Sequence, residues 1–240
     1  MKTAIVTGAS SGIGFAICRM LIGQQIKVYG IGRHFDDEAL QELRTLDEMN
    51  LFTPVQCDLV KTNEVIDLIK NIQKKEEIDI LINNAGVGYF GPHEELNPNK
   101  IHEMVTVNLE VPLLLTNLLL RTLKKNHGFI INISSITAKK SNTYGCAYGA
   151  TKAALTSFSK SLFDEARKYG VKVVSIHPDM TKSNFYRNAN FKEGESLDTY
   201  LLPEEVASAV SMVLSQREGV VVSDITLQPQ RHQLRKQNLS

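Results

Sequence analysis

Short, nearly continuous apolar runs alternate with amphipathic stretches from one end of the chain to the other. Runs such as 78–82 and 171–176 are rich in β-branched residues, which is typical of strands covered on both faces. Strands are therefore predicted over 2–7, 26–31, 52–57, 78–83, 128–134, 171–177 and 219–226. The stretches between them predict helices over 12–23, 37–49, 61–75, 98–125, 147–169 and 203–216.

Repeated strand–helix units favour one fold class. They predict an α/β fold with a doubly wound, seven-stranded parallel sheet flanked by helices. No linker, repeat or low-complexity segment interrupts the pattern, so residues 1–240 are expected to form one domain. Ligands of such sheets bind at the carboxyl ends of the strands, where the candidate chemistry should lie.

Composition narrows the classes of partner. The 240 residues are 42% hydrophobic and 22% charged, as in an ordinary soluble domain. Because 27 basic residues stand against 26 acidic ones, no broad field attracts nucleic acid or a membrane surface. The basic cluster 231–236 is expected to be a solvated end. The most apolar run, 111–120, is too short to span a bilayer and contains Asn117, so a buried helix or a subunit-packing surface is expected.

Cysteine usage indicates a reducing compartment. Cys18, Cys57 and Cys146 are widely spaced and form no metal pattern with the six histidines, so no metal site is expected. The first predicted strand begins within two residues of Met1 and leaves no room for a signal peptide. A cytoplasmic location is therefore expected.

A glycine-rich turn follows the first predicted strand and opens the first helix: Gly8-Ala9-Ser10-Ser11-Gly12-Ile13-Gly14. Gly8 permits a tight turn, Gly12 lets the backbone approach a pyrophosphate, and Gly14 allows close packing of helix on strand. The helix N-terminus then presents N–H groups to the anion. The pattern predicts a dinucleotide site, with an ordinary structural turn as the alternative.

Tyr148 and Lys152 are one helical turn apart, and Ser135 precedes the tyrosine by thirteen residues. A phenol, with a reference pKa of about 10, is a poor acid or base near neutrality. A neighbouring ammonium favours the phenolate and is expected to lower the pKa of Tyr148. This set suits proton transfer at a carbonyl or alcohol oxygen, although without its context the pair would be read as surface residues.

Together these features resemble the short-chain dehydrogenase/reductase family over essentially the whole chain. The matching pieces are the glycine turn, Asn83-Asn84-Ala85-Gly86, Asn108, Asn132-Ile133-Ser134-Ser135, and Tyr148 to Lys152. The resemblance implies a single Rossmann domain and a catalytic set of Asn108, Ser135, Tyr148 and Lys152. The second serine of Ser134-Ser135 takes the catalytic position.

The resemblance also implies a mechanism. Tyr148 exchanges a proton with the substrate oxygen as hydride moves to or from the nicotinamide, and Ser135 hydrogen-bonds that oxygen. Lys152 lowers the pKa of the tyrosine and binds the nicotinamide ribose, while Asn108 positions a water that links Lys152 to solvent. The substrate is a small carbonyl compound or alcohol that the sequence does not specify further.

Cofactor contacts carry over from the same resemblance. They are Gly8, Ser10, Ser11, Gly12, Ile13, Gly14, Asp58, Leu59, Asn84, Ala85, Gly86, Tyr148, Lys152, Pro178 and Thr181. Asp58 matches the family position that bonds the adenine amine, with a helix N-cap as the alternative reading. The turn at Asn84 either contacts the cofactor or serves the sheet structurally.

The end of the second predicted strand bears on cofactor choice. Gly32 occupies the place of the acid that usually binds the adenosine ribose of NAD, and Arg33 follows it. A guanidinium pairs well with a 2′-phosphate, so NADP(H) is favoured. Asp36 and Asp37 keep NAD(H) open, since either acid can serve the ribose instead.

One position departs from the family pattern. The run Pro178-Asp179-Met180-Thr181 has aspartate where the family usually has glycine, a residue that tolerates positive φ less well. Residues 182–202 are expected to form a substrate lid. Aromatic residues there and in other loops are expected either to pack the loops or to contact substrate: Tyr89, Phe90, Tyr144, Phe185, Tyr186, Phe191 and Tyr200.

Two other functions stay open as alternatives. A nucleotide-sensing regulatory protein would keep the dinucleotide site without turnover, but such relatives typically lose the tyrosine or the lysine. Epimerases and dehydratases of this fold usually have longer C-terminal regions. A homodimer or homotetramer is also expected, because the predicted helices carry apolar residues on faces that the family uses for packing: Leu113, Leu114, Leu118, Leu155, Phe158 and Leu162.

Overall fold

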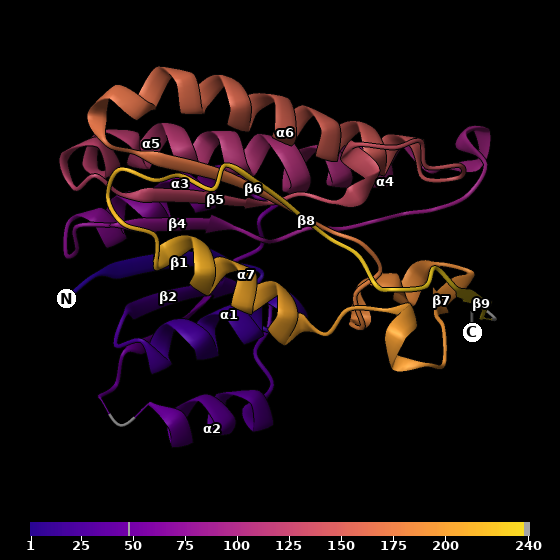
Figure 1. Cartoon of the computed structure of the whole chain (residues 1–240), viewed down its shortest axis with the longest axis horizontal. Coiled ribbons are helices and arrows are strands. Elements are labelled where there is room, and N and C mark those ends of the chain that lie inside the picture. The colour runs from indigo at the N-terminus through magenta and orange to yellow at the C-terminus, as the bar shows by residue number, and fades with distance from the viewer. Residues whose placement is uncertain (48, 238–240) are drawn as a thin grey trace.

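Seven parallel strands form the main sheet of the protein, in the order β3-β2-β1-β4-β5-β6-β8 (Figure 1). The computed structural model describes residues 1–47 and 49–237. The strands are β1 (Thr3–Thr7), β2 (Lys27–Gly32), β3 (Phe52–Gln56), β4 (Ile80–Asn83), β5 (Phe129–Ile133), β6 (Lys172–Pro178) and β8 (Asp224–Leu227). The predicted fold class and sheet are confirmed. The chain order reverses between β1 and β4, which is where open sheets of this kind bind ligands.

Helices cover both faces of this sheet. They are α1 (Gly12–Gly23), α2 (Asp37–Leu46), α3 (Thr62–Gln73), α4 (Pro98–Val105), α5 (Val111–Lys125), α6 (Cys146–Ala166) and α7 (Pro203–Leu214). Figure 1 shows α1, α2 and α7 on one side of the sheet and α3, α5 and α6 on the other. Side chains alternate along β1 between the two layers: Ala4 and Val6 join one buried cluster and Ile5 the other.

The predicted helix over 98–125 is interrupted in the structure. Residues Thr106–Glu110 form a π-helical segment between α4 and α5, and Asn108 lies inside it. Such segments insert an extra residue into the helix and often occur at functional sites. The α-helical spacing of the sequence gives no sign of this insertion.

Length and composition would allow the stretch Pro98–Lys125 to cross a membrane. The apolar run 111–120, judged too short for that, is part of this longer stretch. Half of its most apolar window is buried in the fold, where α5 packs against α3 and β4. This is the placement of a core helix in a folded domain.

The basic cluster at the C-terminal end is largely exposed to solvent, as expected, but it is also paired with the lid. Strand β9 (Leu234–Lys236) pairs antiparallel with β7 (Phe191–Glu193), which lies in the predicted lid. The Arg231 guanidinium donates to both carboxylate oxygens of Asp198, at 2.6 and 2.9 Å. Residues 231–237, the C-terminal strap, therefore hold the lid beside the carboxyl ends of the strands (Figure 1).

Candidate active site

The glycine turn has the geometry that the sequence predicts. Gly8 and Gly12 both have positive φ, +68° and +54°, which side-chain-bearing residues rarely adopt. A Cβ on Gly14 would collide with the Gly8 carbonyl, whose carbon would lie only 2.7 Å away. The turn is therefore a cradle that larger residues would fill, and α1 begins there without a side-chain cap on its N–H groups.

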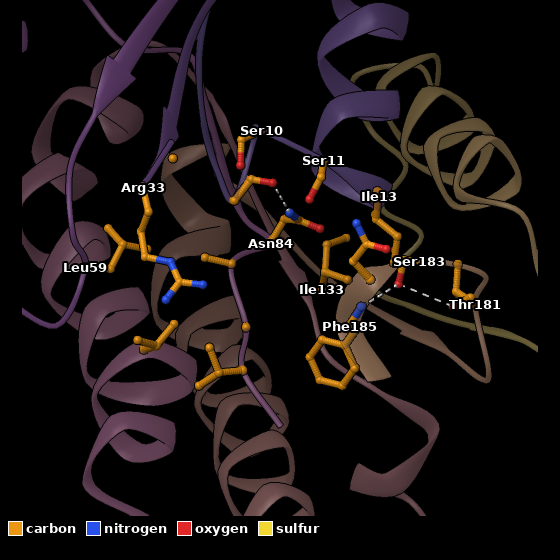
Figure 2. A pocket seen from close by; sticks show the side chains of 18 of the residues that line it. Ser10, Ser11, Ile13, Arg33, Leu59, Asn84, Ile133, Thr181, Ser183 and Phe185 are labelled. Atoms are coloured by element: carbon orange, nitrogen blue, oxygen red, sulfur yellow. Dashed lines mark hydrogen bonds between the residues drawn. The ribbon is translucent and has the colours of Figure 1, made fainter. Parts of the chain in front are cut away.

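Asn84 supports this cradle from the neighbouring strand. Its side-chain amide donates to the Thr7 carbonyl at 2.9 Å and to the Gly8 carbonyl at 3.3 Å. Asn84 therefore has a structural role, the alternative that the sequence offered for this turn. It also lines the cleft beside the turn, as Figure 2 shows.

One cleft at the carboxyl ends of the strands joins nearly all the predicted cofactor residues (Figure 2). Those lining it are Gly8, Ser10, Ser11, Gly12, Ile13, Arg33, Asp58, Leu59, Asn84, Ala85, Gly86, Tyr148, Lys152, Pro178 and Thr181, together with Ser135. Gly14 and Asn108 do not line it. Gly14 allows helix α1 to pack closely on the turn, and Asn108 lies behind the residues that line the cleft.

Arg33 reaches into one end of this cleft (Figure 2), where its guanidinium lies 4.0 Å from the Glu103 carboxylate. Asp36 and Asp37, the acids that could bind the adenosine ribose of NAD(H), do not line the cleft. Asp36 pairs with His34 at 3.2 Å and both acids stand at the start of α2. Arg33 is thus the predicted charged residue best placed for an adenosine phosphate.

Asp58 lies in the cleft wall rather than at a helix start. Its carboxylate accepts from the Val60 N–H at 3.2 Å, and the N-cap of α3 is Lys61. The N-cap alternative for Asp58 is therefore wrong, and the residue lines the cleft.

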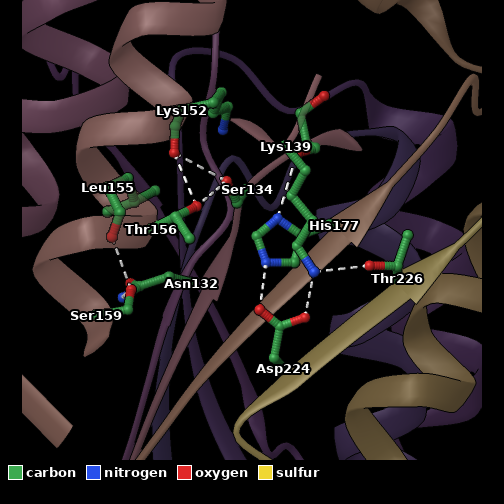
Figure 3. A network of polar contacts seen from close by, with 11 residues as sticks. Asn132, Ser134, Lys139, Lys152, Leu155, Thr156, Ser159, His177, Asp224 and Thr226 are labelled. Carbon is green, nitrogen blue, oxygen red and sulfur yellow. Dashed lines mark hydrogen bonds and ion pairs between the residues drawn. The ribbon is translucent and has the colours of Figure 1, made fainter. Parts of the chain in front are cut away.

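Helix α6 presents Tyr148 and Lys152 to the cleft, and Ser135 follows β5 beside them. The Ser135 hydroxyl lies beside the Tyr148 hydroxyl and accepts from the Thr137 N–H at 3.2 Å. Ser134 instead donates to the Lys152 carbonyl at 3.1 Å and contacts the Thr156 hydroxyl at 2.9 Å (Figure 3). The second serine of the pair thus lies next to the tyrosine, while the first holds β5 to α6.

The expected direction of the tyrosine pKa is wrong in this structure. Burial raises the pKa of Tyr148 to about 12, and the hydrogen bond from Ser135 opposes this only in part. Lys152 Nζ lies 5.9 Å from the centroid of the tyrosine ring and donates to the Ile133 carbonyl at 2.8 Å. Burial lowers the pKa of this lysine to about 8.

Asn108 is fully buried, with its side chain bonded to protein groups. Its amide oxygen accepts from the Val87 N–H at 2.8 Å, and its amide nitrogen donates to the Val87 carbonyl and to the Thr151 hydroxyl at 2.9 and 3.1 Å. The π-helical segment thus uses Asn108 to fix the loop after β4 against α6. The predicted water-positioning role stays a prediction.

The turn at Asp179 does not need glycine. No positive φ occurs at Asp179, so the strain considered for aspartate there is absent. Its carboxylate accepts from the Met180 N–H at 2.8 Å and lies 3.5 Å from Lys140 Nζ. The Thr181 hydroxyl donates to the Asp179 carbonyl at 2.9 Å, which holds the turn beside the cleft.

A second, more apolar pocket adjoins the first at Ser135, Tyr148, Asp179 and Tyr186, which line both. The lid and the loop after β4 form its aromatic wall: Phe90 lies 5.2 Å from Phe191 and 5.7 Å from Tyr148, centroid to centroid. These aromatic residues pack the loops and also line the pocket. The pocket therefore opens onto the hydroxyls of Ser135 and Tyr148.

Several residues that line the two pockets were not predicted from the sequence. Glu103 faces Arg33 from α4, and His232 and Leu234 of the C-terminal strap line the second pocket. Glu103 forms an ordinary i,i+3 pair with Lys100, so its spacing carries no functional signal. The strap residues depend on a pairing across the chain. In the described part of the chain, no group of three or more His, Cys, Asp or Glu residues could hold a metal ion.

Comparison with known proteins agrees with this geometry. The family model described as short chain dehydrogenase matches residues 2–194. An uncharacterized oxidoreductase of Staphylococcus epidermidis is 33% identical over 232 residues, covering 95% of this chain and 97% of the relative. The chain belongs to the short-chain dehydrogenase/reductase family, and it is an NAD(P)-dependent oxidoreductase of that family.

Solved structures are similar over the same extent. An alcohol dehydrogenase from the archaeon Thermococcus sibiricus, complexed with 5-hydroxy-NADP, superimposes with a TM-score of 0.86 at 27% identity, covering 97% of this chain and 99% of that one. A metagenomic short-chain oxidoreductase in complex with NADP gives 0.80 at 29% identity, covering 95% and 97%. A 4-hydroxyisoleucine dehydrogenase complexed with NADH, at 24% identity and a TM-score of 0.82, shares the fold and covers 95% and 98%.

Proposed function

We propose that this protein is an NADP(H)-dependent oxidoreductase that interconverts a small carbonyl compound and a secondary alcohol, with Tyr148 as the general acid and base. The observation that carries the proposal is the meeting of two pockets at Ser135 and Tyr148. A nicotinamide bound in the first pocket would supply or accept the hydride. The second pocket is apolar enough to hold the carbon skeleton of the substrate.

Each residue has a distinct part in the proposed reaction. Because burial raises the pKa of Tyr148 to about 12, its phenol is protonated at neutral pH and can donate a proton to the substrate oxygen. The Ser135 hydroxyl is placed to hydrogen-bond that oxygen as charge develops on it. Lys152 is buried but lines the cleft, and Gly86 places no side chain over it: a Cβ there would lie 3.5 Å from Nζ. Its ammonium is therefore available to hold ribose hydroxyls.

The proposed activity is tested by incubating the protein with NADPH and a panel of ketones, aldehydes and secondary alcohols. Oxidation of the nicotinamide is followed by its absorbance. Turnover of at least one carbonyl compound, reversed with the matching alcohol and NADP, is the expected result. Tight binding of NADPH with no turnover on any compound would instead support the alternative of a nucleotide-sensing protein.

We expect Arg33→Ala to weaken NADPH binding by about tenfold to a hundredfold and NADH binding very little. Among the residues that the structure describes, the 57%-exposed Arg33 side chain pairs only with Glu103, at 4.0 Å, so a phosphate can recruit the guanidinium at small cost. Dissociation constants from fluorescence titration measure the effect. Arg19→Ala is the matched control, because Arg19 is also exposed but pairs with Glu42 outside the cleft. Equal losses for both cofactors would contradict the NADP(H) preference.

We also propose that the protein forms a homodimer or homotetramer through α5 and α6. The fold itself buries Leu155 and Leu162, so ordinary packing explains them. Leu113 on α5 stays exposed, and Leu118 and Phe158 are only partly covered. Light scattering of the purified protein is expected to give a multiple of the 26.8 kDa chain mass; a monomer would remove the proposal.

A further inference from the structure

His177 lies in β6 directly behind Ser135 and belongs to none of the predicted roles. Its side chain is completely buried. Nδ1 of the ring lies 3.2 Å from the Ser135 carbonyl oxygen, and Nε2 lies 3.2 Å from a carboxylate oxygen of Asp224 (Figure 3). Both nitrogens of this histidine therefore face hydrogen-bond acceptors.

A neutral imidazole cannot satisfy both neighbours. It carries one N–H, so it donates to one acceptor and turns a lone pair toward the other, whereas the protonated ring donates to both. A carboxylate is the stronger acceptor of the two. When the ring is neutral, its proton is therefore best placed on Nε2. The Ser135 carbonyl then loses the histidine donor and keeps the Ala138 N–H, which donates to it at 3.0 Å.

The charged groups that face this ring come from two elements. Asp224 belongs to β8, and Lys139 follows the short helix after β5 and pairs with the other oxygen of Asp224. Lys139 also donates to the Thr226 hydroxyl at 2.9 Å, which fixes the carboxylate between lysine and histidine (Figure 3). Burial lowers the pKa of His177, and the Asp224 carboxylate opposes this only in part. The ring is thus neutral at pH 7 and gains its second proton below its ordinary value of about 6.5.

We propose that His177 is a positioning residue whose protonation state decides whether the Ser135 carbonyl, already bonded to the Ala138 N–H, also accepts a hydrogen bond from β6. Protonation below neutral pH would add the histidine bond to the Ser135 carbonyl and further fix the residue whose hydroxyl lies beside Tyr148. Deprotonation would remove the histidine bond while the bonds to Ala138 and Asp224 persist. The effect on catalysis depends on the proposed function, whereas the hydrogen-bond exchange does not.

Asp224→Asn separates this arrangement from a merely structural one. With Lys139 held by the amide oxygen, the amide nitrogen would donate to Nε2, so a neutral His177 would keep its proton on Nδ1 and its bond to Ser135 at every pH. Nitrogen-15 NMR of the histidine rings, assigned with His177→Gln, reads the tautomer directly. The expected result is an Nε2–H tautomer in the neutral wild type and an Nδ1–H tautomer in Asp224→Asn. The same tautomer in both would overturn the proposal.

A second measurement requires no variant. The amide of Ile136, which shares a peptide group with the Ser135 carbonyl, is expected to shift in the wild type with the same midpoint as His177. An Ile136 amide that stays unchanged while His177 titrates would also overturn the proposal. This keeps the test decisive if Asp224→Asn fails to fold.

Turnover gives the functional readout. The ratio of wild-type to Asp224→Asn kcat cancels the ionisation of Tyr148, which both proteins share. The ratio is expected to be near one below the midpoint at which NMR shows His177 titrating and to fall about fivefold above it, the effect of one hydrogen bond. A ratio independent of pH, with turnover present, would refute the role of His177 alone. No turnover in either protein would refute the proposed function. The NMR result would then be the test of the His177 proposal.

Discussion

Tyr148→Phe is expected to reduce carbonyl turnover by about 10²- to 10⁴-fold, the usual contribution of a positioned general acid. Phenylalanine keeps the ring that packs 5.7 Å from Phe90 and 5.5 Å from Phe185, so the pocket wall should survive. Only the hydroxyl is removed, which is the proton donor to the substrate oxygen and lies beside Ser135. The measurement is kcat with NADPH and the best compound of the panel.

Cofactor affinity separates a lost proton donor from a damaged site. NADPH binding to Tyr148→Phe is expected to change by less than about tenfold, because at most one hydrogen bond to the cofactor is lost. Tyr29→Phe is the matched control: its hydroxyl contacts Glu76 at 3.3 Å, far from the cleft lining, and full activity is expected. If Tyr148→Phe turned over at the wild-type rate, Tyr148 could not be the general acid of the proposed mechanism.

The parts of the site that follow from local spacing could be predicted from the sequence. Gly8, Gly12 and Gly14 act within one turn, and their roles depend on backbone geometry that other residues cannot adopt. Tyr148 and Lys152 share a helix face because they are four residues apart. The alternation of strands and helices likewise fixes the class of sheet, since each element carries its own pattern.

The parts that depend on distant contacts could not be predicted. The pKa of Tyr148 is raised because the lid and the loop after β4 bury it, and the sequence does not show how deeply. Lys152 of α6 donates a hydrogen bond to the Ile133 carbonyl of β5, which its spacing from Tyr148 does not indicate. The C-terminal strap has the sequence of a solvated charged tail. Its ion pair joins Arg231 to Asp198, 33 residues away, and no local pattern indicates that pairing.

Gly14→Ala is expected to destabilise the protein by about 2–3 kcal/mol, in the upper part of the range for overpacked sites. The new methyl group would press on the Gly8 carbonyl and lie 2.5 Å from the Asn84 amide nitrogen, so backbone, not a flexible side chain, must move. For a chain of this length the melting temperature should fall by about 4–12 °C. Because the same carbonyl belongs to the cradle, NADPH affinity should fall by at least about tenfold.

Gly23→Ala provides the matched control for this substitution. Gly23 ends the same helix α1, and a Cβ there would meet nothing within 4 Å. Alanine lowers the conformational entropy of the unfolded chain, so this variant should be as stable as the wild type or up to about 1 kcal/mol more stable. Urea denaturation of both variants measures the difference. If Gly14→Ala matched Gly23→Ala in stability and in NADPH affinity, close packing of α1 on the turn could not be what requires glycine at position 14.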